Sequence, residues 1–301
     1  NNNSIEIKIV PSEINYPAKI SIIPDTKFVQ LAAKVITVDE NSEQSVSVRR
    51  LRGTNLISVT GNIKKDSKPI SEHVSITDPT MFFLTVLKEV FEQKGIIIKG
   101  RIGGIESAEK NIPSDDLTPI FSHRSVPLKM ILKELNKNSN NFYAEQILKT
   151  IGLEIYNFGT IENGVKACND FFNTMGINPE NMVMADGSGL SRLNLVTPRQ
   201  IVNLLSYMNK SDEFLQFYES LPIAGVDGTL IDRMKRTSAE NNVRAKAGYN
   251  NNVSALSGYL KTVSGEQLVF SMLVNNYLVP PALANYILDN VCHRLVNFIR
   301  N

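Results

Sequence analysis

The chain has 301 residues, of which 42% are hydrophobic and 21% charged, and its formal net charge is +2. This length is enough for one large domain and a smaller one, each with its own core. The near balance of 32 basic and 30 acidic side chains argues against nucleic acid or an anionic membrane as a partner. The apolar runs are far shorter than the roughly 20 residues of a transmembrane helix, so we predict no transmembrane segment.

Neither the cysteines nor the histidines predict a metal site. Cys168 and Cys292 each lie on the apolar side of a predicted helix, so we expect small buried hydrophobes, with a disulfide as the alternative. His73, His123 and His293 are far apart in sequence and lack the spacing of metal ligands. We therefore expect no metal, no other cofactor and no histidine-based triad.

Residues 1–76 are predicted to form a β-rich accessory region. Alternating apolar and β-branched residues, separated by Pro, Asn, Asp and Gly turns, favour four strands there. These are Ser4–Val10, Lys19–Ile23, Val46–Leu51 and Leu56–Thr60. This region could set the choice of substrate or partner.

A change of pattern at Asp78-Pro79 predicts a second division of the chain, over residues 77–301. This helix-start signal precedes a predicted helix at Met81–Lys94 and a strand at Ile96–Lys99. A polar linker, Glu106–Asp116, separates these elements from the part of the chain with helical periodicity.

Helical spacing dominates from residue 128 to residue 208. One predicted helix ends near Asn136–Asn138, and a second runs from about residue 141 to residue 150 and stops at Gly152. Thr160 is the expected N-cap of a third, and Thr197-Pro198 is a cap followed by proline at the first helical position.

The pattern then becomes strand-like before a last helix. Three antiparallel strands are predicted, with a turn at Ser264-Gly265, followed by a helix over Pro281–Arg300. The strands are Val243–Tyr249, Val253–Thr262 and Gln267–Asn275. Helices, then an antiparallel run, then a terminal helix predict an α+β fold in which helices pack on a sheet.

Two short segments could carry chemistry. Ser139 and Asn141 lie at a helix–helix junction, where a hydroxyl and an amide can converge on one group. Lys246 precedes Gly248 at the start of a strand, and a glycine there lets a peptide lie close to the backbone. The alternatives are helix capping for Ser139 and Asn141, and a solvated lysine on the strand.

Five motifs stand in order along the chain. They are SNNFYAEQ from Ser139, DGSGLSR from Asp186, VTP from Val196, LPIAGVDGTL from Leu221 and KAG from Lys246, the last followed by VSALSGY. Together they resemble the low-molecular-mass penicillin-binding proteins that act as D-alanyl-D-alanine carboxypeptidases and endopeptidases, peptidase family S13. The Ser-x-x-Lys, Ser-Asp-Asn and Lys-Thr-Gly set is a known signature of penicillin-binding proteins. The resemblance implies a penicillin-binding/β-lactamase-like transpeptidase domain.

The resemblance also implies roles for individual residues. Ser139 would relay protons, and Asn141 would hold the carbonyl of the substrate's peptide. Lys246 would attract the substrate's terminal carboxylate, with Ala247 and Gly248 beside it. The backbone N–H of Tyr249 would supply half of the oxyanion hole. The chemistry implied is acyl transfer through an acyl-enzyme.

The chain departs from the family pattern in its first element and at three further positions. In the family the nucleophile precedes a large insertion, and we expect this chain to begin inside that insertion. The nucleophile-bearing segment, with its Ser-x-x-Lys, would then be absent, and the transpeptidase domain would be incomplete at its N-terminus. Ala247 replaces the family's threonine, Tyr249 replaces a small hydroxyl residue and Asn140 replaces an aspartate.

The sequence therefore leaves two functions open. One is a serine-type D-Ala-D-Ala carboxypeptidase/endopeptidase acting on peptidoglycan stem peptides, with β-lactams as covalent inhibitors if the nucleophile is present. The other is a non-catalytic relative that binds cell-wall peptide or a partner protein. The family's substrate implies a periplasmic or cell-envelope location.

Overall fold

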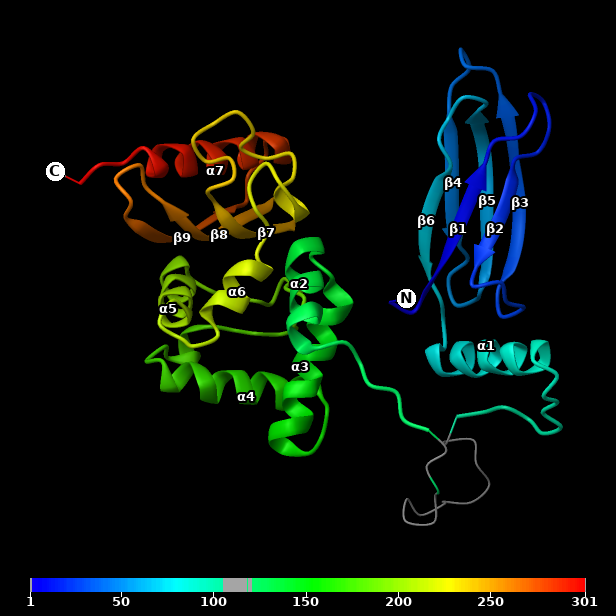
Figure 1. Ribbon diagram of the computed structural model, residues 1–301, viewed down its shortest axis with the longest axis horizontal. Coiled ribbons are helices and arrows are strands. Elements are labelled where there is room, and N and C mark those ends of the chain that lie inside the picture. The colour runs from blue at the N-terminus through cyan, green and yellow to red at the C-terminus, as the bar shows by residue number, and fades with distance from the viewer. Residues whose placement is uncertain (1, 105–117, 119–120, 301) are drawn as a thin grey trace. The chain divides into compact units, whose positions relative to one another are not determined.

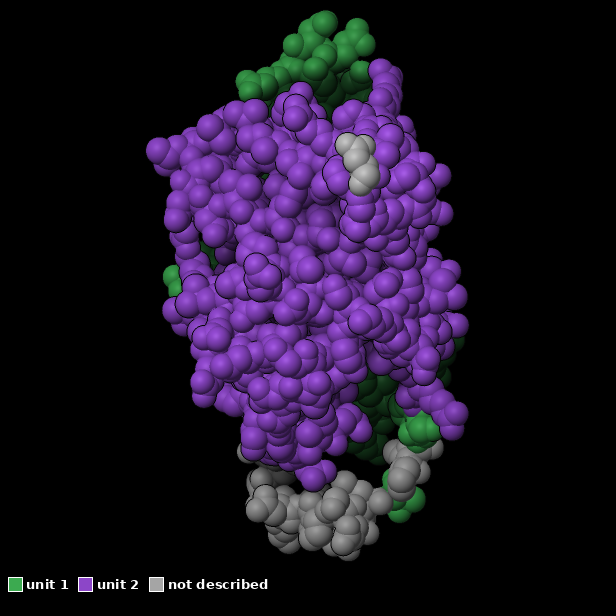
Figure 2. Space-filling view, turned by 90° about the vertical axis from the view of Figure 1, so that its left-hand side faces the viewer, with its two compact units in different colours: residues 1–122 green, residues 123–301 purple. Residues whose placement is uncertain are grey.

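The computed structural model describes residues 2–104, 118 and 121–300. The chain divides into two units, Asn1–Ser122 and His123–Asn301. Figure 2 colours the two units separately. The predicted linker Glu106–Asp116 lies outside the described residues.

The first unit contains two three-stranded sheets around one apolar core (Figure 1). Isoleucines 5, 7 and 9 of β1 point inward at alternate positions and are fully buried, as the period of a strand requires. The sheets have the strand orders β2-β1-β6 and β3-β5-β4. Their strands are β1 Ser4–Val10, β2 Lys19–Ile23, β3 Gln30–Val38, β4 Ser45–Arg50, β5 Leu56–Lys64 and β6 Ile70–Ser75.

The four strands predicted in this region are confirmed, and two further strands were not anticipated. Strand β6 reads Ile-Ser-Glu-His-Val-Ser and is mostly exposed, so its apolar alternation is weak. Strand β3 contains an exposed Ala-Ala-Lys run that hides its period. Both strands exist because neighbouring strands pair with them, which a local pattern does not record.

Helix α1 (Pro79–Gln93) begins at Asp78, whose side chain accepts a hydrogen bond from the backbone N–H of Met81 at 2.9 Å. Phe82 on this helix is buried in the apolar core of the strands. The unit boundary after Ser122 therefore keeps α1 with the strands, whereas the sequence-based division places it with residues 77–301.

The strand predicted at Ile96–Lys99 is wrong. The segment has no regular structure, and Ile97 is 78% exposed. Within the described part of the chain it has no partner strand. Consecutive isoleucines favour extended backbone, but a strand also requires a neighbour to accept and donate its hydrogen bonds.

The second unit is built on an antiparallel sheet of order β7-β8-β9. Its strands are β7 Arg244–Asn250, β8 Val253–Lys261 and β9 Gln267–Asn275, which confirms the three predicted strands to within a residue at each end. In the described residues, β9 pairs with β8 alone and so forms one edge of the sheet. Strand β7 forms the other edge.

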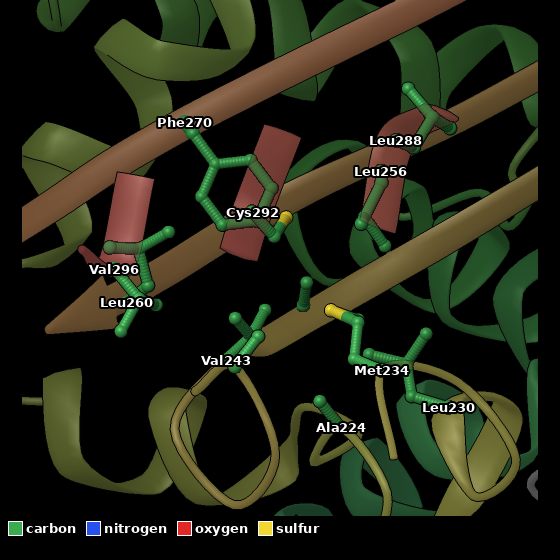
Figure 3. Close-up of a cluster of buried hydrophobic side chains, with 12 residues drawn as sticks. Ala224, Leu230, Met234, Val243, Leu256, Leu260, Phe270, Leu288, Cys292 and Val296 are labelled. Atoms are coloured by element: carbon green, nitrogen blue, oxygen red, sulfur yellow. The ribbon is translucent and has the colours of Figure 1, made fainter. Parts of the chain in front are cut away.

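Helices cover both faces of this sheet (Figure 1). Helix α7 (Pro281–Val296) packs on one face, where Leu256 and Leu260 of β8 and Cys292 of the helix belong to one buried apolar cluster (Figure 3). On the opposite face Tyr259 is fully buried against Leu205 and donates a hydrogen bond to its carbonyl at 2.8 Å. Side chains alternate along β8, so this strand contributes residues to the apolar clusters on both faces of the sheet.

The remaining helices are α2 Leu128–Asn138, α3 Asn141–Tyr156, α4 Ile161–Thr174, α5 Pro198–Met208 and α6 Phe214–Ser220. They confirm the predicted α+β class, in which helices pack on a sheet. The thiols of Cys168 and Cys292 are both free, so the disulfide alternative is wrong. The last helix ends at Val296 and not at Arg300, because Asn297 closes it by donating to the carbonyl of His293.

The predicted helix stop at Gly152 is also wrong, because this glycine serves a helix contact. A Cβ atom on Gly152 would lie 2.7 Å from the backbone nitrogen of Gly164 in α4, and one on Gly164 would lie 2.2 Å from the carbonyl oxygen of Leu148. The two glycines let the backbones of α3 and α4 approach more closely than any other residue would allow.

Gly164→Ala should therefore destabilise the second unit. Its methyl group would meet backbone, which cannot move aside as a flexible side chain can, and overpacking of this kind costs about 1–3 kcal/mol. We expect the midpoint of thermal unfolding, followed by circular dichroism, to fall by several degrees. The exposed change Glu154→Ala on α3 serves as the control. Equal midpoints for Gly164→Ala and the parent chain would contradict this account of the contact.

Candidate active site

The junction of α2 and α3 occupies two residues, Ser139 and Asn140, and has an unusual backbone. Ser139 closes α2 in the left-handed conformation, with φ 53° and ψ 50°. That region costs a residue other than glycine roughly 1–2 kcal/mol. Asn140 then caps α3, because its side chain accepts a hydrogen bond from the N–H of Tyr143 at 3.1 Å. Aspartate and asparagine are equally good caps, so this departure from the family pattern preserves the junction.

Strand β7 presents an open edge at the same place. The N–H of Ala245 points away from β8, since it donates to the carbonyl of Pro222 at 3.0 Å. Alternate residues of a strand direct their N–H groups to the same edge. The N–H groups of Ala247 and Tyr249 therefore also point outward, away from β8. This is the orientation that a backbone oxyanion donor at Tyr249 requires.

Lys246 joins the strand to the helix junction. Its Nζ atom donates to Oγ of Ser139 at 2.8 Å and to the carbonyl oxygen of Ala247 at 2.9 Å. Burial lowers the pKa of the Lys246 ammonium, because the charged form loses hydration. The strand lysine is thus not the solvated side chain of the alternative interpretation.

The residues predicted from the sequence meet around one cavity of about 430 Å³. Each of the six lines it: Ser139, Asn141, Lys246, Ala247, Gly248 and Tyr249. Sequence reasoning did not single out the other residues of the lining. They are Ser188, Gly189, Leu190, Thr229, Arg233 and Asn285. Most of them lie in or beside the DGSGLSR and LPIAGVDGTL strings, whose match to the family was the available signal.

The DGSGLSR string forms a loop held by carboxylates. The side chain of Asp186 accepts hydrogen bonds from the N–H groups of Gly189 at 2.7 Å and Ser191 at 2.6 Å. Burial alone would raise the pKa of Asp186, but hydrogen bonds from Asn194 and these N–H groups outweigh it and lower the pKa. The ionised carboxylate therefore fixes the loop that brings Leu190 to the cavity.

A partly buried ion pair fixes another wall of the cavity. Nζ of Lys137, in the last turn of α2, lies 2.6 Å from a carboxylate oxygen of Asp227, and Asp227 also accepts from the N–H of Ile223. Gly228 follows, and a Cβ atom on it would lie 2.5 Å from the carbonyl oxygen of Lys137. The end of α2 and the short helix η4 (Gly228–Leu230) are thus held together, which places Thr229 at the cavity.

The described residues show neither a metal-binding cluster nor a membrane-spanning helix. No group of three or more His, Cys, Asp or Glu side chains there has an arrangement that could hold a metal ion. None of the helices described combines the length and the apolar character needed to cross a membrane.

The expectation that the chain lacks a Ser-x-x-Lys needs a correction from the sequence itself. Ser107-Ala108-Glu109-Lys110 has that spacing. It follows the β-rich region, whereas the family's nucleophile precedes it. The string also lies outside the described residues, so no nucleophile is assigned in the cavity.

Asp227→Asn should loosen the wall of the cavity. The change leaves the ammonium of Lys137 buried without a counter-charge, since the Lys137 side chain is only 10% exposed. Because the Asp227 side chain is 38% exposed, we expect a loss of unfolding free energy of roughly 1–3 kcal/mol. Urea unfolding would measure it. Asp232→Asn, which breaks an exposed pair with Lys235, is the control and should change stability by less than about 1 kcal/mol. Equal effects of the two changes would contradict the role given to the buried pair.

Comparisons with known proteins agree with the motifs. The model of the D-Ala-D-Ala carboxypeptidase 3 (S13) family matches residues 1–292. A D-alanyl-D-alanine carboxypeptidase of Actinomadura sp. is 33% identical over 300 residues, covering 97% of this chain and 54% of the relative. The D-alanyl-D-alanine carboxypeptidase DacB of Haemophilus influenzae is 28% identical over 269 residues, covering 88% of this chain and 53% of the relative.

The fold agrees with a solved structure as well. The crystal structure of penicillin binding protein 4 (dacB) from Haemophilus influenzae superposes with a TM-score of 0.75 at 24% identity, covering 99% of this chain and 67% of the other. This confirms the predicted penicillin-binding fold class. The chain spans about half the length of the curated relatives it matches. With a family model that matches nearly its whole length, the chain belongs to the D-Ala-D-Ala carboxypeptidase 3 (S13) family.

Proposed function

We propose that this chain carries the peptide-binding and proton-relay part of a serine-type D-Ala-D-Ala carboxypeptidase/endopeptidase that acts on peptidoglycan stem peptides. The observation that carries the proposal is the hydrogen bond of 2.8 Å between Lys246 Nζ and Ser139 Oγ at the wall of the cavity. It joins the second and third family elements from positions 107 residues apart. Membership of the family supports the reaction class.

In the proposed reaction a serine hydroxyl attacks the carbonyl carbon of the penultimate D-Ala. The bond from that carbon to the nitrogen of the terminal D-Ala breaks, and the hydroxyl proton passes to the leaving amine. Water then cleaves the acyl-enzyme ester and restores the serine. The nucleophile of this step is not assigned to any described residue. The chain's described residues bind the peptide, orient its carbonyl group and relay the proton.

Each side chain has a defined part in this proposal. Ser139 passes the proton along its hydrogen bond with Lys246, which keeps the relay polarised. The amide of Asn141 lines the cavity without a hydrogen-bond partner in the described residues, so it is available to a peptide carbonyl. The outward N–H of Tyr249 stabilises the oxyanion. Such a substrate lies outside the cytoplasm, and we propose a periplasmic or cell-envelope location.

A second candidate is a non-catalytic relative that binds cell-wall peptide or a partner protein. The observation that favours it is the alanine at position 247, in the cavity wall beside Lys246. The family's threonine offers a hydroxyl to the substrate at that point, and alanine offers none. A weaker hold on the substrate would reduce turnover more than it would abolish binding.

The test uses the purified whole protein and measures two products. A short peptide ending in D-Ala-D-Ala should release D-alanine, and a penicillin should add its mass to the protein in intact-mass spectrometry. Lys246→Met and Ser139→Ala should each lower both rates by at least about 10²-fold, the smaller value typical of general acid–base groups. The exposed Lys235→Met should leave them unchanged.

The outcomes separate the two candidates. Peptide binding that depends on Lys246, with no release of D-alanine and no penicillin adduct, would overturn the enzyme and favour the binding relative. Absence of both turnover and binding would overturn both candidates. Lys235→Met acting like Lys246→Met would contradict the role of the cavity.

Affinity for the peptide should also fall at alkaline pH. Its terminal carboxylate needs the ammonium form of Lys246, which exists below the folded pKa and is lost above it. Because burial lowers that pKa, the loss should begin at a lower pH than for an ordinary lysine, with Kd rising tenfold per pH unit beyond it. Lys246→Arg should remove this pH dependence, because a guanidinium stays charged. A pH dependence that persists in Lys246→Arg would assign it to another group.

A further inference from the structure

The cavity has an excess of donors for an anion. Among the described residues, its lining contains two cationic side chains, Lys246 and Arg233, and no carboxylate. The third family element, which normally contributes a hydroxyl for the substrate's carboxylate, here has Ala247. A hydroxyl for the carboxylate must therefore come from another residue of the lining.

Four hydroxyl groups line the cavity, and two of them are already engaged. Ser139 accepts from Lys246 at 2.8 Å, and Ser188 is hydrogen-bonded to the carboxylate of Asp186. The hydroxyls of Thr229 and Tyr249 have no hydrogen-bond partner among the described residues. Tyr249 is 59% exposed, so its ring extends toward solvent.

Thr229 stands on a rigid support. It is the middle residue of η4, which packs against both α2 and β7. The ion pair of Lys137 with Asp227 and the close approach of Gly228 to the Lys137 carbonyl fix the start of this turn. A hydroxyl held this way needs little ordering when a ligand binds, which favours affinity.

Arg233 follows four residues later and is only partly used. Its Nε and Nη2 atoms donate to the carboxylate of Asp289, with the shortest distance 2.6 Å, and Nη2 also lies 3.4 Å from the carbonyl of Asn285. Its Nη1 atom has no hydrogen-bond partner among the described residues. It also differs from the polar atoms there that are both fully buried and unpaired, which are Arg50 Nε and Glu89 Oε2. The Arg233 side chain lines the cavity and is 13% exposed, so Nη1 can donate to a ligand there, while Asp289 fixes the plane of the guanidinium.

We propose that Thr229 and Arg233 form the subsite for the substrate's terminal carboxylate, in place of the hydroxyl that Ala247 lacks. This inference rests on the proposed function and names two further specificity-determining residues for it. Hydroxyl and guanidinium donors suit a carboxylate, and they do not suit a C-terminal amide, whose NH₂ group would face other donors. The subsite therefore selects peptides with a free carboxyl end.

The test compares two forms of one uncleavable peptide. In it –CH₂–CH₂– replaces the scissile amide of a D-Ala-D-Ala end, so turnover cannot interfere with calorimetry. The parent chain should bind the free acid more tightly than the C-terminal amide. A hydrogen bond to a charged group corresponds to about a 10- to 100-fold change in affinity, so Thr229→Val and Arg233→Lys should each reduce this preference by that factor.

Matched variants exclude a general effect. Tyr249→Phe removes the other unengaged hydroxyl, and Arg236→Lys changes an exposed arginine near the same turn. Both should leave the acid preference unchanged. In the Thr229→Val background, Ala247→Thr should restore at least part of the preference, which a merely structural role for Thr229 does not predict.

Each result decides one point. Equal affinity of the acid and the amide for the parent chain, or loss of the preference in Tyr249→Phe and not in Thr229→Val, would overturn the subsite while leaving the proposed function in place. Binding of neither form would overturn the proposed function itself, and this inference with it.

Discussion

The walls of the cavity depend on one ion pair, between Lys137 and Asp227. The nearly buried ammonium of Lys137 needs a counter-charge. The pair therefore holds the loop that carries Asp227 against the end of α2. The pair thereby links the junction that holds Ser139 to the turn that holds Thr229. The close contact of Gly228 with the Lys137 carbonyl removes the remaining freedom between the two segments.

The sheet adds the third wall, and it does so through its edge. Because the N–H of Ala245 is bonded to Pro222 on the side away from β8, the outward donors of β7 continue along the cavity. The Lys246 side chain extends from this strand to Ser139, and its burial removes part of its hydration. A lysine with a lowered pKa exchanges its proton closer to neutral pH, which is useful for a relay between hydroxyl groups.

Much of the fold was predictable where the pattern is local. The strands β7, β8 and β9 alternate cleanly and have good turns between them, and the caps at Asp78, Thr160 and Thr197 are read from two or three residues. Features that depend on distant neighbours were not predictable. Gly152 reads as a helix stop until α4 is placed against it.

In the candidate site, too, some residues could be predicted from the sequence and others could not. The residues Ser139, Asn141 and Lys246 came from the family resemblance, since their local patterns are those of caps and of a solvated lysine. Thr229 lies within the LPIAGVDGTL string and Arg233 three residues beyond it, but neither has a local pattern that indicates a site, because the segments that fold beside them bring them to the cavity. Lys137 resembles any polar residue of a surface helix, and only the structure reveals its burial.

Strand β9 has a consequence for how the protein behaves in solution. Its nine residues contain neither a charge nor a proline, and in the described residues only one of its edges is paired. Soluble proteins usually place lysine, proline or a bulge on such an edge, because a free row of N–H and C=O groups is a template for a further strand. Any strand that pairs with this edge, from the same polypeptide or from another molecule, would extend the sheet. If the edge stays unpaired, concentrated samples should be prone to self-association.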